Sequence, residues 1–342
     1  MRNKYLITGG AGFIGSNYVS RLLQRGEDVT IFDNLSRIGG RNNLEWLSET
    51  FGSNSFKFIK GDIRNEKEIN TCAKDVDVIV HLAAQVAVTN SVNDPVEDFE
   101  INARGTFNVL EAARNSNNLP IVLYASTNKV YGSLKHLKIV EEPSRYRYKD
   151  YTQGISEEFS LDFHSPYGCS KGCGDQYAHD YGRIYNLPTI VLRQSCIYGP
   201  KQFGIEDQGW VAWFIIASIL KKKITIYGNG KQVRDILYID DLLDLYDLVI
   251  KNIDVSAGNI FNVGGGIENT ISIWSEFGPI LEKFHKEKIP FTNEDWRPGD
   301  QKVFVTDIRK AQQVLNWSPK IGVQEGIGLL FDWVNKNNRM FV

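Results

Sequence analysis

Gly9-Gly10-Ala11-Gly12-Phe13-Ile14-Gly15 is the stretch that decides the fold of this 342-residue chain. It follows an apolar run at residues 5–8 and opens an amphipathic run at residues 13–25, which predicts a strand, a tight turn and a helix. Glycines at 9, 12 and 15 let the backbone approach a pyrophosphate, whose charge then lies on the unpaired N–H groups of the helix N-terminus. The stretch therefore predicts a dinucleotide-binding Rossmann unit.

An acidic residue at the end of the second predicted strand favours NAD over NADP. Asp33 lies 18 residues beyond Gly15, close to the distance of about 20 expected for a carboxylate that binds the adenosine ribose. A carboxylate there accepts hydrogen bonds from the ribose hydroxyls and repels a 2′-phosphate. Arg37 leaves NADP open as an alternative, because a nearby arginine could compensate for the acid.

The rest of the N-terminal half alternates short apolar runs with longer amphipathic ones. We predict strands at 5–8, 28–32, 56–60, 76–81, 120–124 and 189–193, and helices at 13–25, 94–116 and 166–186. This alternation is typical of an α/β fold with a doubly wound parallel sheet. We expect residues 1–193 and about 237–265 to form the NAD-binding Rossmann domain, and 194–236 and 266–342 a smaller C-terminal substrate-binding lobe.

Composition argues against several function classes. A formal net charge of −2, with 23% charged residues, does not fit a general nucleic-acid or membrane binder. No apolar run approaches the roughly 20 residues needed to span a bilayer, and the N-terminal sequence lacks the features of a signal peptide. The four cysteines lack zinc-like spacing. These observations predict a cytoplasmic protein without a metal site.

The catalytic candidates are Tyr167 and Lys171, four residues apart behind Pro166. A proline suits the first helical turn, so both side chains are expected on one helix face. An unperturbed tyrosine, with a pKa of about 10, is a poor base at neutral pH. A neighbouring ammonium lowers that pKa, which allows the phenolate to take a hydroxyl proton while hydride leaves the same carbon for NAD.

Further motifs extend over nearly the whole length. They read GGAGFIG, FDNLSR, GDIR, HLAAQ, NARGT, STNKVYG, SPYGCSK, VRD and RPGDQ. With them the chain resembles the extended short-chain dehydrogenases/reductases, the NAD-dependent epimerase/dehydratase family. The resemblance implies that Thr127 binds the reacting hydroxyl and completes a catalytic set with Tyr167 and Lys171.

The same resemblance implies further ligand contacts. Those to NAD fall on Gly9, Gly12, Phe13, Ile14, Gly15, Asp33, Asn34, Ser36, Arg37, Asp62, Ile63, Leu82, Ala83, Gln85, Asn102, Ala125, Tyr167 and Lys171. Those to a nucleotide-sugar substrate fall on Gln85, Thr127, Asn128, Gln208, Arg234 and Arg297. Many relatives also pair two helices across a two-fold axis, so a homodimer or homotetramer is expected.

Two residues after Thr127 separate members of the family. Dehydratases carry an Asp-Glu pair that supplies the acid and base for water elimination, whereas this chain has Asn128 and Lys129. Without those carboxylates, elimination lacks proton carriers. STNKVYG, LDFHSPYGCSKG and DQGWVAWF instead resemble 2-epimerases of CDP-linked sugars. A UDP-hexose 4-epimerase, a dehydrogenase that releases NADH, and a NAD-sensing regulator remain as alternatives.

The segment 133–165 is polar and rich in aromatic residues, and a loop of that length is usually functional or disordered. We expect it to cover the sugar. His164 is a candidate second base in that segment, although a structural role is expected for it and for His81.

Overall fold

The computed structural model describes residues 2–297 and 300–341 and divides into two compact units. The first comprises residues 1–130, 165–193 and 243–261, and the second residues 131–164, 194–242 and 262–342. Pro298 and Gly299 of the RPGDQ motif lie outside the described residues.

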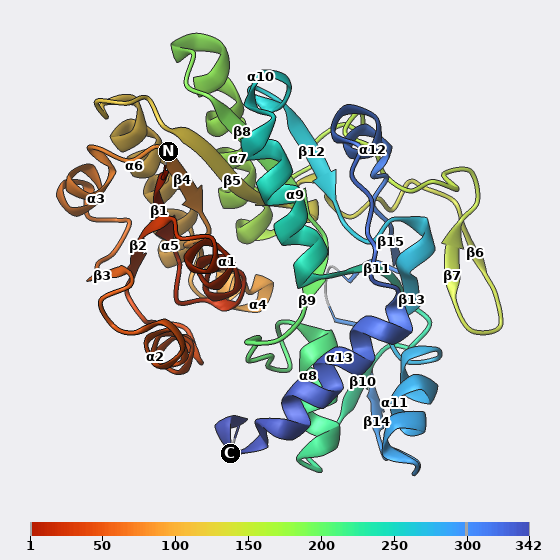
Figure 1. Ribbon diagram of the computed structural model, residues 1–342. Helices are drawn as coiled ribbons and strands as arrows, with labels where there is room; N and C mark the ends of the chain where they lie inside the picture. Colours follow the sequence, from red (N-terminus) through yellow and green to blue (C-terminus); the bar gives the residue numbers. More distant parts are fainter. Residues whose placement is uncertain (1, 298–299, 342) are drawn as a thin grey trace. The chain divides into compact units, whose positions relative to one another are not determined.

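A seven-stranded sheet organises the first unit, in the order β12-β8-β5-β4-β1-β2-β3 (Figure 1). The ladders that join β1 to β2 and β4, β2 to β3, and β4 to β5 are parallel. The strands are β1 (Lys4–Thr8), β2 (Asp28–Asp33), β3 (Lys57–Lys60), β4 (Val78–His81), β5 (Ile121–Thr127), β8 (Thr189–Gln194) and β12 (Ile260–Val263). The order 3-2-1-4-5 is that of a Rossmann fold, so the predicted fold class is confirmed.

Alternation along the strands explains why helices cover both faces of the sheet. Leu6 packs into a core with Val109 and Ala178 on one face. Tyr5 points to the opposite face, where its ring contacts Tyr18 edge-to-face. Figure 1 shows helices on the two faces of this sheet. They are α1 (Phe13–Gln24), α2 (Gly40–Phe51), α3 (Glu66–Ala73), α4 (Val88–Asn93), α5 (Pro95–Phe99), α6 (Gly105–Arg114), α7 (Ser165–Tyr185), α9 (Ile239–Lys251, from Leu243 onward) and α10 (Ile253–Ser256).

The helix predicted over 94–116 is interrupted. A π-helical turn, Glu100–Arg104, separates α5 from α6. Such a turn inserts an extra residue and often marks a functional site. Here it turns Asn102 inward, where the side chain is buried. Hydrophobic periodicity does not report this insertion, because the residues on both sides remain helical.

In its described part, the second unit holds four strands in one sheet, two strand pairs and four longer helices. The strands are β6 (Ile139–Glu141), β7 (Tyr146–Tyr148), β9 (Cys196–Tyr198), β10 (Thr225–Tyr227), β11 (Val233–Tyr238), β13 (Thr270–Ser272), β14 (Thr292–Glu294) and β15 (Val303–Phe304). The helices are α8 (Trp210–Ile219), α11 (Phe277–His285), α12 (Arg309–Leu315) and α13 (Val323–Lys336). Apolar runs in the sequence predict a helix at 210–221, a strand at 225–227 and a helix near 324–335, in agreement with α8, β10 and α13.

The boundaries between the units differ from those expected. Residues 131–164 belong to the second unit, because the Tyr131 hydroxyl donates to Asn262 at 2.7 Å and the Ile155 amide donates to the Val305 carbonyl at 2.8 Å. Residues 237–242 and 262–265 also join the second unit, so its share of the chain is larger than predicted. Among the described residues, every helix is too short or too polar to span a bilayer.

Candidate active site

The glycine loop at the start of α1 is shaped by a close approach of backbone to backbone. Gly9 has a φ of 71°, and a Cβ there would lie 2.7 Å from the Ala83 nitrogen. A Cβ on Gly15 would overlap the Gly9 carbonyl oxygen. No side chain of the described residues caps α1, whose N-cap is Gly12. The first turn of α1 therefore presents backbone N–H groups to an anion.

Asp33 at the end of β2 joins this loop to the sheet. Its carboxylate accepts from the Ala11 amide at 3.0 Å and from the Leu35 amide at 2.8 Å. Burial raises the pKa of Asp33, while these two hydrogen bonds lower it. The carboxylate thus holds the glycine loop as well as standing where a ribose acceptor is expected. The sequence predicts only the ribose role.

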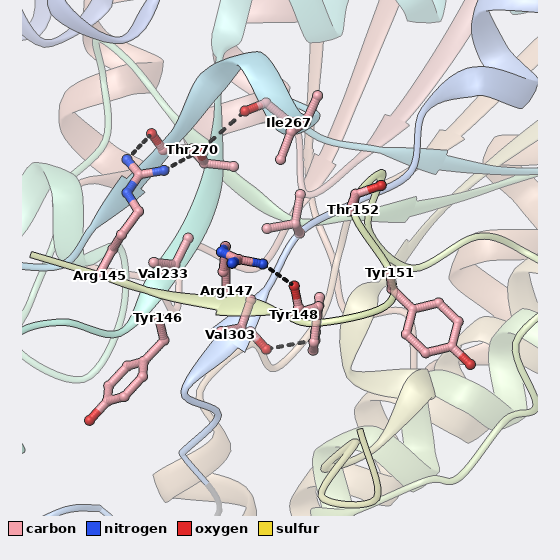
Figure 2. Close-up of a pocket in the computed structure, with 11 residues that line it drawn as sticks. Arg145, Tyr146, Arg147, Tyr148, Tyr151, Thr152, Val233, Ile267, Thr270 and Val303 are labelled. Atoms are coloured by element: carbon pink, nitrogen blue, oxygen red, sulfur yellow. Dashed lines mark hydrogen bonds between the residues drawn. The ribbon is translucent and has the colours of Figure 1, made fainter. Parts of the chain in front are cut away.

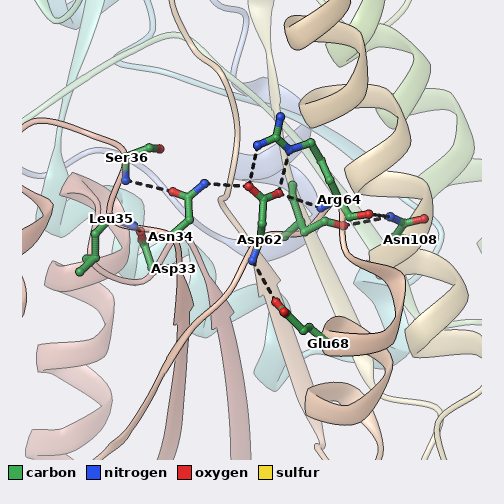
Figure 3. Close-up of polar contacts among 9 residues, drawn as sticks. Asp33, Asn34, Leu35, Ser36, Asp62, Arg64, Glu68 and Asn108 are labelled. Atoms are coloured by element: carbon green, nitrogen blue, oxygen red, sulfur yellow. Dashed lines mark hydrogen bonds and ion pairs between the residues drawn. The ribbon is translucent and has the colours of Figure 1, made fainter.

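A polar cluster follows β3, as Figure 3 shows. The Asp62 carboxylate accepts from Arg64 at 2.8 Å and from Asn34 at 3.1 Å. The Arg64 side chain, as the largest cause, lowers the pKa of Asp62 to about 2, so this residue stays ionised at neutral pH. The Asn108 amide donates to the Ile63 carbonyl at 2.9 Å and fixes the turn that carries Asp62 and Ile63.

The predicted catalytic side chains come together at the end of β5 and the start of α7. Tyr167 is 9% exposed, Lys171 4% and Thr127 6%. The pKa of Tyr167 is raised, whereas the sequence predicts that it is lowered by a neighbouring ammonium. Burial is the largest cause; a hydrogen bond with Thr127 lowers this pKa, and the charges of Asp98 and Arg37 raise and lower it respectively. Thr127 also lies 3.4 Å from the Asn128 side-chain oxygen.

Lys171 is held in an unusual environment for a lysine. Its ammonium lies 4.4 Å from the centre of the Tyr124 ring, a cation–π contact. The Tyr124 hydroxyl donates to the Lys171 carbonyl at 3.1 Å. Burial lowers the pKa of Lys171 to about 7, against the charges of Asp175 and Asp98, which raise it. A lysine with so low a pKa in a group of ionisable side chains is typical of a functional site.

Asp98 lies at the centre of a set of hydrogen bonds that we call the Asp98 cage, formed with Gln85, Asn102 and Ser170. The carboxylate accepts from Ser170 at 2.5 Å, from Gln85 at 2.7 Å and from Asn102 at 3.1 Å. The Gln85 side-chain nitrogen also donates to the Ala87 carbonyl. Its two hydrogens are therefore both used, one by Asp98 and one by Ala87. Gln85 and Asn102 are site residues predicted from the sequence, whereas Asp98 and Ser170 are not. Asp98 precedes Asn102 by four residues, a spacing that places two side chains on the same face of a helix and is the one sequence signal for this contact.

Beside the cage, the strand end that carries Leu82 and Ala83 is fixed by hydrogen bonds to β1. The Leu82 amide donates to the Thr8 carbonyl at 3.0 Å, and the Ala83 amide to the Thr8 hydroxyl at 3.3 Å. His81 lies buried between the hydroxyls of Thr8 and Thr106. Burial lowers the pKa of His81 to about 3, so the ring is neutral, as its predicted structural role requires.

In the second unit, Arg234 and Arg297 have different surroundings. Arg234 is buried and donates to the Asp300 carboxylate at 2.8 Å. Arg297 is partly exposed; its guanidinium carbon lies 3.8 Å from the centre of the Tyr227 ring, and it pairs with Asp207 at 3.2 Å. Gln208 is half-buried beside this pair, at a turn closed by backbone hydrogen bonds to Ile205.

The segment 133–165 contains regular strands, whereas the sequence predicts a loop that covers the sugar. Its hairpin, β6–β7, buries Tyr146 and Tyr148, and the Tyr148 hydroxyl donates to the Val303 carbonyl at 2.8 Å. Figure 2 shows these tyrosines along a cavity of about 220 Å³ within the second unit. His164 is exposed. The buried tyrosines therefore serve the core of this unit.

Comparison with known proteins agrees with this geometry. The profile of the family described as GDP-mannose 4,6 dehydratase matches residues 6–329. The chain is 46% identical to CDP-paratose 2-epimerase of Salmonella typhi, over 97% of this chain and 99% of that protein. It is 35% identical to a putative UDP-glucose 4-epimerase of Methanocaldococcus jannaschii, over 98% and 99%.

A solved structure shows the same fold with ligands. The UDP-glucuronic acid 4-epimerase of Bacillus cereus, in complex with UDP-glucuronic acid and NAD, has a TM-score of 0.82 and 28% identity, over 98% of this chain and 99% of that one. The family profile and the curated relatives both match nearly the whole chain, which establishes the family. The chain belongs to the NAD-dependent epimerase/dehydratase family of extended short-chain dehydrogenases/reductases.

Proposed function

We propose that the chain is a nucleotide-sugar epimerase that inverts C2 of a CDP-linked dideoxyhexose, converting CDP-paratose to CDP-tyvelose with tightly bound NAD. The observation that carries this proposal is the group formed by Thr127, Tyr167 and Lys171 in the unit that also holds the glycine loop. The 46% identity to a CDP-paratose 2-epimerase supports the choice of substrate.

The residues of the first unit fit a dinucleotide. The space at Gly9 and Gly15 is one that a Cβ would fill, and the first turn of α1 offers its N–H groups to the pyrophosphate. Asp33 would accept from the ribose, and Asp62 and Ile63 would hold the adenine. Bound there, NAD would supply the acceptor, and later the donor, of the sugar's hydride.

The protein side chains move the proton. The Tyr167 oxygen takes the proton of the C2 hydroxyl as the carbon is oxidised, and returns it after the keto sugar has turned. Thr127 hydrogen-bonds the same hydroxyl and fixes its distance from Tyr167. The Lys171 ammonium favours the Tyr167 phenolate electrostatically. Asn128 and Lys129 lack the carboxylates that a dehydratase uses, which favours epimerisation.

The diphosphate is assigned to Arg234 and Arg297, whose planar guanidinium groups suit phosphate oxygens. Arg297 already stacks on Tyr227, which limits the freedom that its side chain would lose on binding. Gln208, one residue from Asp207, is a further candidate contact of the sugar nucleotide.

An isotope experiment tests the reaction and its carbon together. A CDP-paratose substrate with deuterium at C2 should keep its label in the product, and the reaction in D₂O should introduce little deuterium at C2. The hydrogen travels as a hydride, so it does not exchange with water. In a parallel reaction with unlabelled substrate, proton NMR should show a changed H1–H2 coupling, which marks inversion at C2.

Other outcomes separate the alternatives. Inversion at C4 with a UDP-hexose would favour a UDP-hexose 4-epimerase, and steady accumulation of NADH would favour a nucleotide-sugar dehydrogenase. Loss of the C2 label to solvent would indicate deprotonation chemistry and contradict the mechanism. CDP-, UDP-, GDP- and dTDP-sugars assayed in parallel would identify the base.

We expect the purified protein to carry NAD without addition. An internal hydride cycle regenerates the cofactor, so release has no role in turnover. The supernatant of denatured protein should contain close to one NAD per chain and little NADP, because Asp33 repels a 2′-phosphate. A preparation with mainly NADP would show that Arg37 outweighs Asp33.

The partner expected besides the substrate is a second copy of the chain. Phe107 on α6 and Tyr177 on α7 are exposed yet contact each other edge-to-face, with ring centres 5.8 Å apart. Two apolar helix faces of this kind suit a helix bundle between protomers. Light scattering should give the mass of a homodimer or homotetramer, and Phe107→Glu should shift it toward the monomer.

A further inference from the structure

The burial of Asp98 needs an explanation that neither the fold nor the proposed reaction supplies. Its exposure is 0%, and the Asp98 cage consists of the neutral side chains Gln85, Asn102 and Ser170. Among the described residues, no ion pair includes Asp98. Removing an ionised carboxylate from water is costly unless hydrogen bonds and a nearby opposite charge compensate for it.

Asp175 provides the contrast, since it is an equally buried acid close to Lys171. It forms a two-pronged ion pair with Arg193, at 2.9 Å for each nitrogen, and accepts from Ser126 at 2.6 Å. Asp175 thus has its own cation in Arg193. Both acids raise the pKa of Lys171, Asp175 more strongly, but Asp98 also raises the pKa of Tyr167 and so acts on both members of the catalytic pair.

Asp98 lies next to the segment of α7 that carries Tyr167 and Lys171. Ser170, which donates to it, immediately precedes Lys171 on α7 and itself lies 3.2 Å from the Tyr167 carbonyl. The charged or ionisable groups around Lys171 are Asp98 on α5, Asp175 and Tyr167 on α7, Arg193 on β8, neutral His81 on β4 and Tyr124 on β5. Arg37 adds a positive charge near Tyr167.

We propose that Asp98 is a positioning residue of the catalytic pair, which holds Lys171 as an ammonium and anchors the N-terminal part of α7 through Ser170. This inference rests on the proposed role of Tyr167 and Lys171. The negative charge favours the ammonium and disfavours the phenolate, so it raises the pKa of both groups. The Asp98 cage surrounds the carboxylate with neutral donors, none of which is a cation that would cancel its effect.

Asp98→Asn tests the charge at nearly constant shape. Removing the charge lowers the pKa of both Tyr167 and Lys171. Turnover needs the form of the Tyr167–Lys171 pair that holds one proton. Gain of a second proton sets the acid limb of the pH profile, and loss of the last proton sets the alkaline limb. Both limbs of the kcat profile should therefore move toward acid, by on the order of one pH unit. Glu97→Gln removes an exposed charge one residue away and should leave the profile in place.

A second measurement separates this inference from the identity of the substrate. The ultraviolet titration of Tyr167, isolated by difference against Tyr167→Phe in NAD-loaded protein, needs no sugar. In Asp98→Asn it should shift toward acid in the same way. Asp98→Ser, which also removes the charge but leaves room for water, serves where the Asn variant fails to fold. Unmoved titration and unmoved limbs, with only a uniform loss of activity, would overturn the proposal.

Discussion

Tyr167→Phe should lower kcat by roughly 10²- to 10⁴-fold, the usual contribution of a positioned acid/base group. The ring still fills its buried position, but no oxygen is left to take the proton of the reacting hydroxyl. The substrate and NAD should still bind, because the aromatic surface is unchanged. Turnover of the C2-labelled substrate, NAD content and the thermal unfolding midpoint measure these three effects.

Tyr177→Phe is the matched control on the same helix. Tyr177 lies on α7 and is exposed, so loss of its hydroxyl should leave kcat unchanged. Near-normal turnover in Tyr167→Phe would rule out Tyr167 as the proton acceptor, whatever the identity of the sugar.

Arg193→Met should destabilise the fold by about 3–5 kcal/mol, the usual effect of removing one partner from a buried ion pair. Arg193 and Asp175 have side chains that are 3% and 0% exposed, and methionine leaves the Asp175 carboxylate without its cation. A lower urea midpoint for unfolding, with an unchanged slope, measures the effect. The loss should extend to catalysis, because Ser126 and Lys171 lie beside Asp175.

Arg183→Met is the control for a surface pair. Arg183 and Asp180 pair at 2.6 Å on the same helix but are 60% and 48% exposed, where such pairs contribute little. Its midpoint should stay close to that of the unchanged protein. Equal effects of the two substitutions would show that burial does not distinguish these pairs.

Much of the fold follows from local patterns in the sequence. The strand, glycine loop and helix at residues 4–24 depend on the spacing of glycines and apolar residues within one short segment, and the structure places them as predicted. Tyr167 and Lys171 share a helix face because four residues make about one turn. For the same reason, the helix predicted over 166–186 agrees with α7 to within one residue at each end.

The sequence does not give the partners of charged residues far apart in the chain. Arg234 pairs with Asp300, 66 residues away, whereas the sequence predicts for Arg234 only a contact to the substrate. Residues 131–164 pack with the second unit through contacts to Asn262 and Val305. No local period encodes such contacts.

The sequence by itself determined the Rossmann class, the family and the candidate catalytic set, because these rest on residues at short, fixed spacings. Only the tertiary structure decided where the charges are buried. Asp98 stands between Glu97 and Phe99, where nothing local indicates burial, yet Ser170, 72 residues away, donates to it inside the protein. The hydrogen bonds that offset the cost of burying this carboxylate come from donors that only the folded chain brings together.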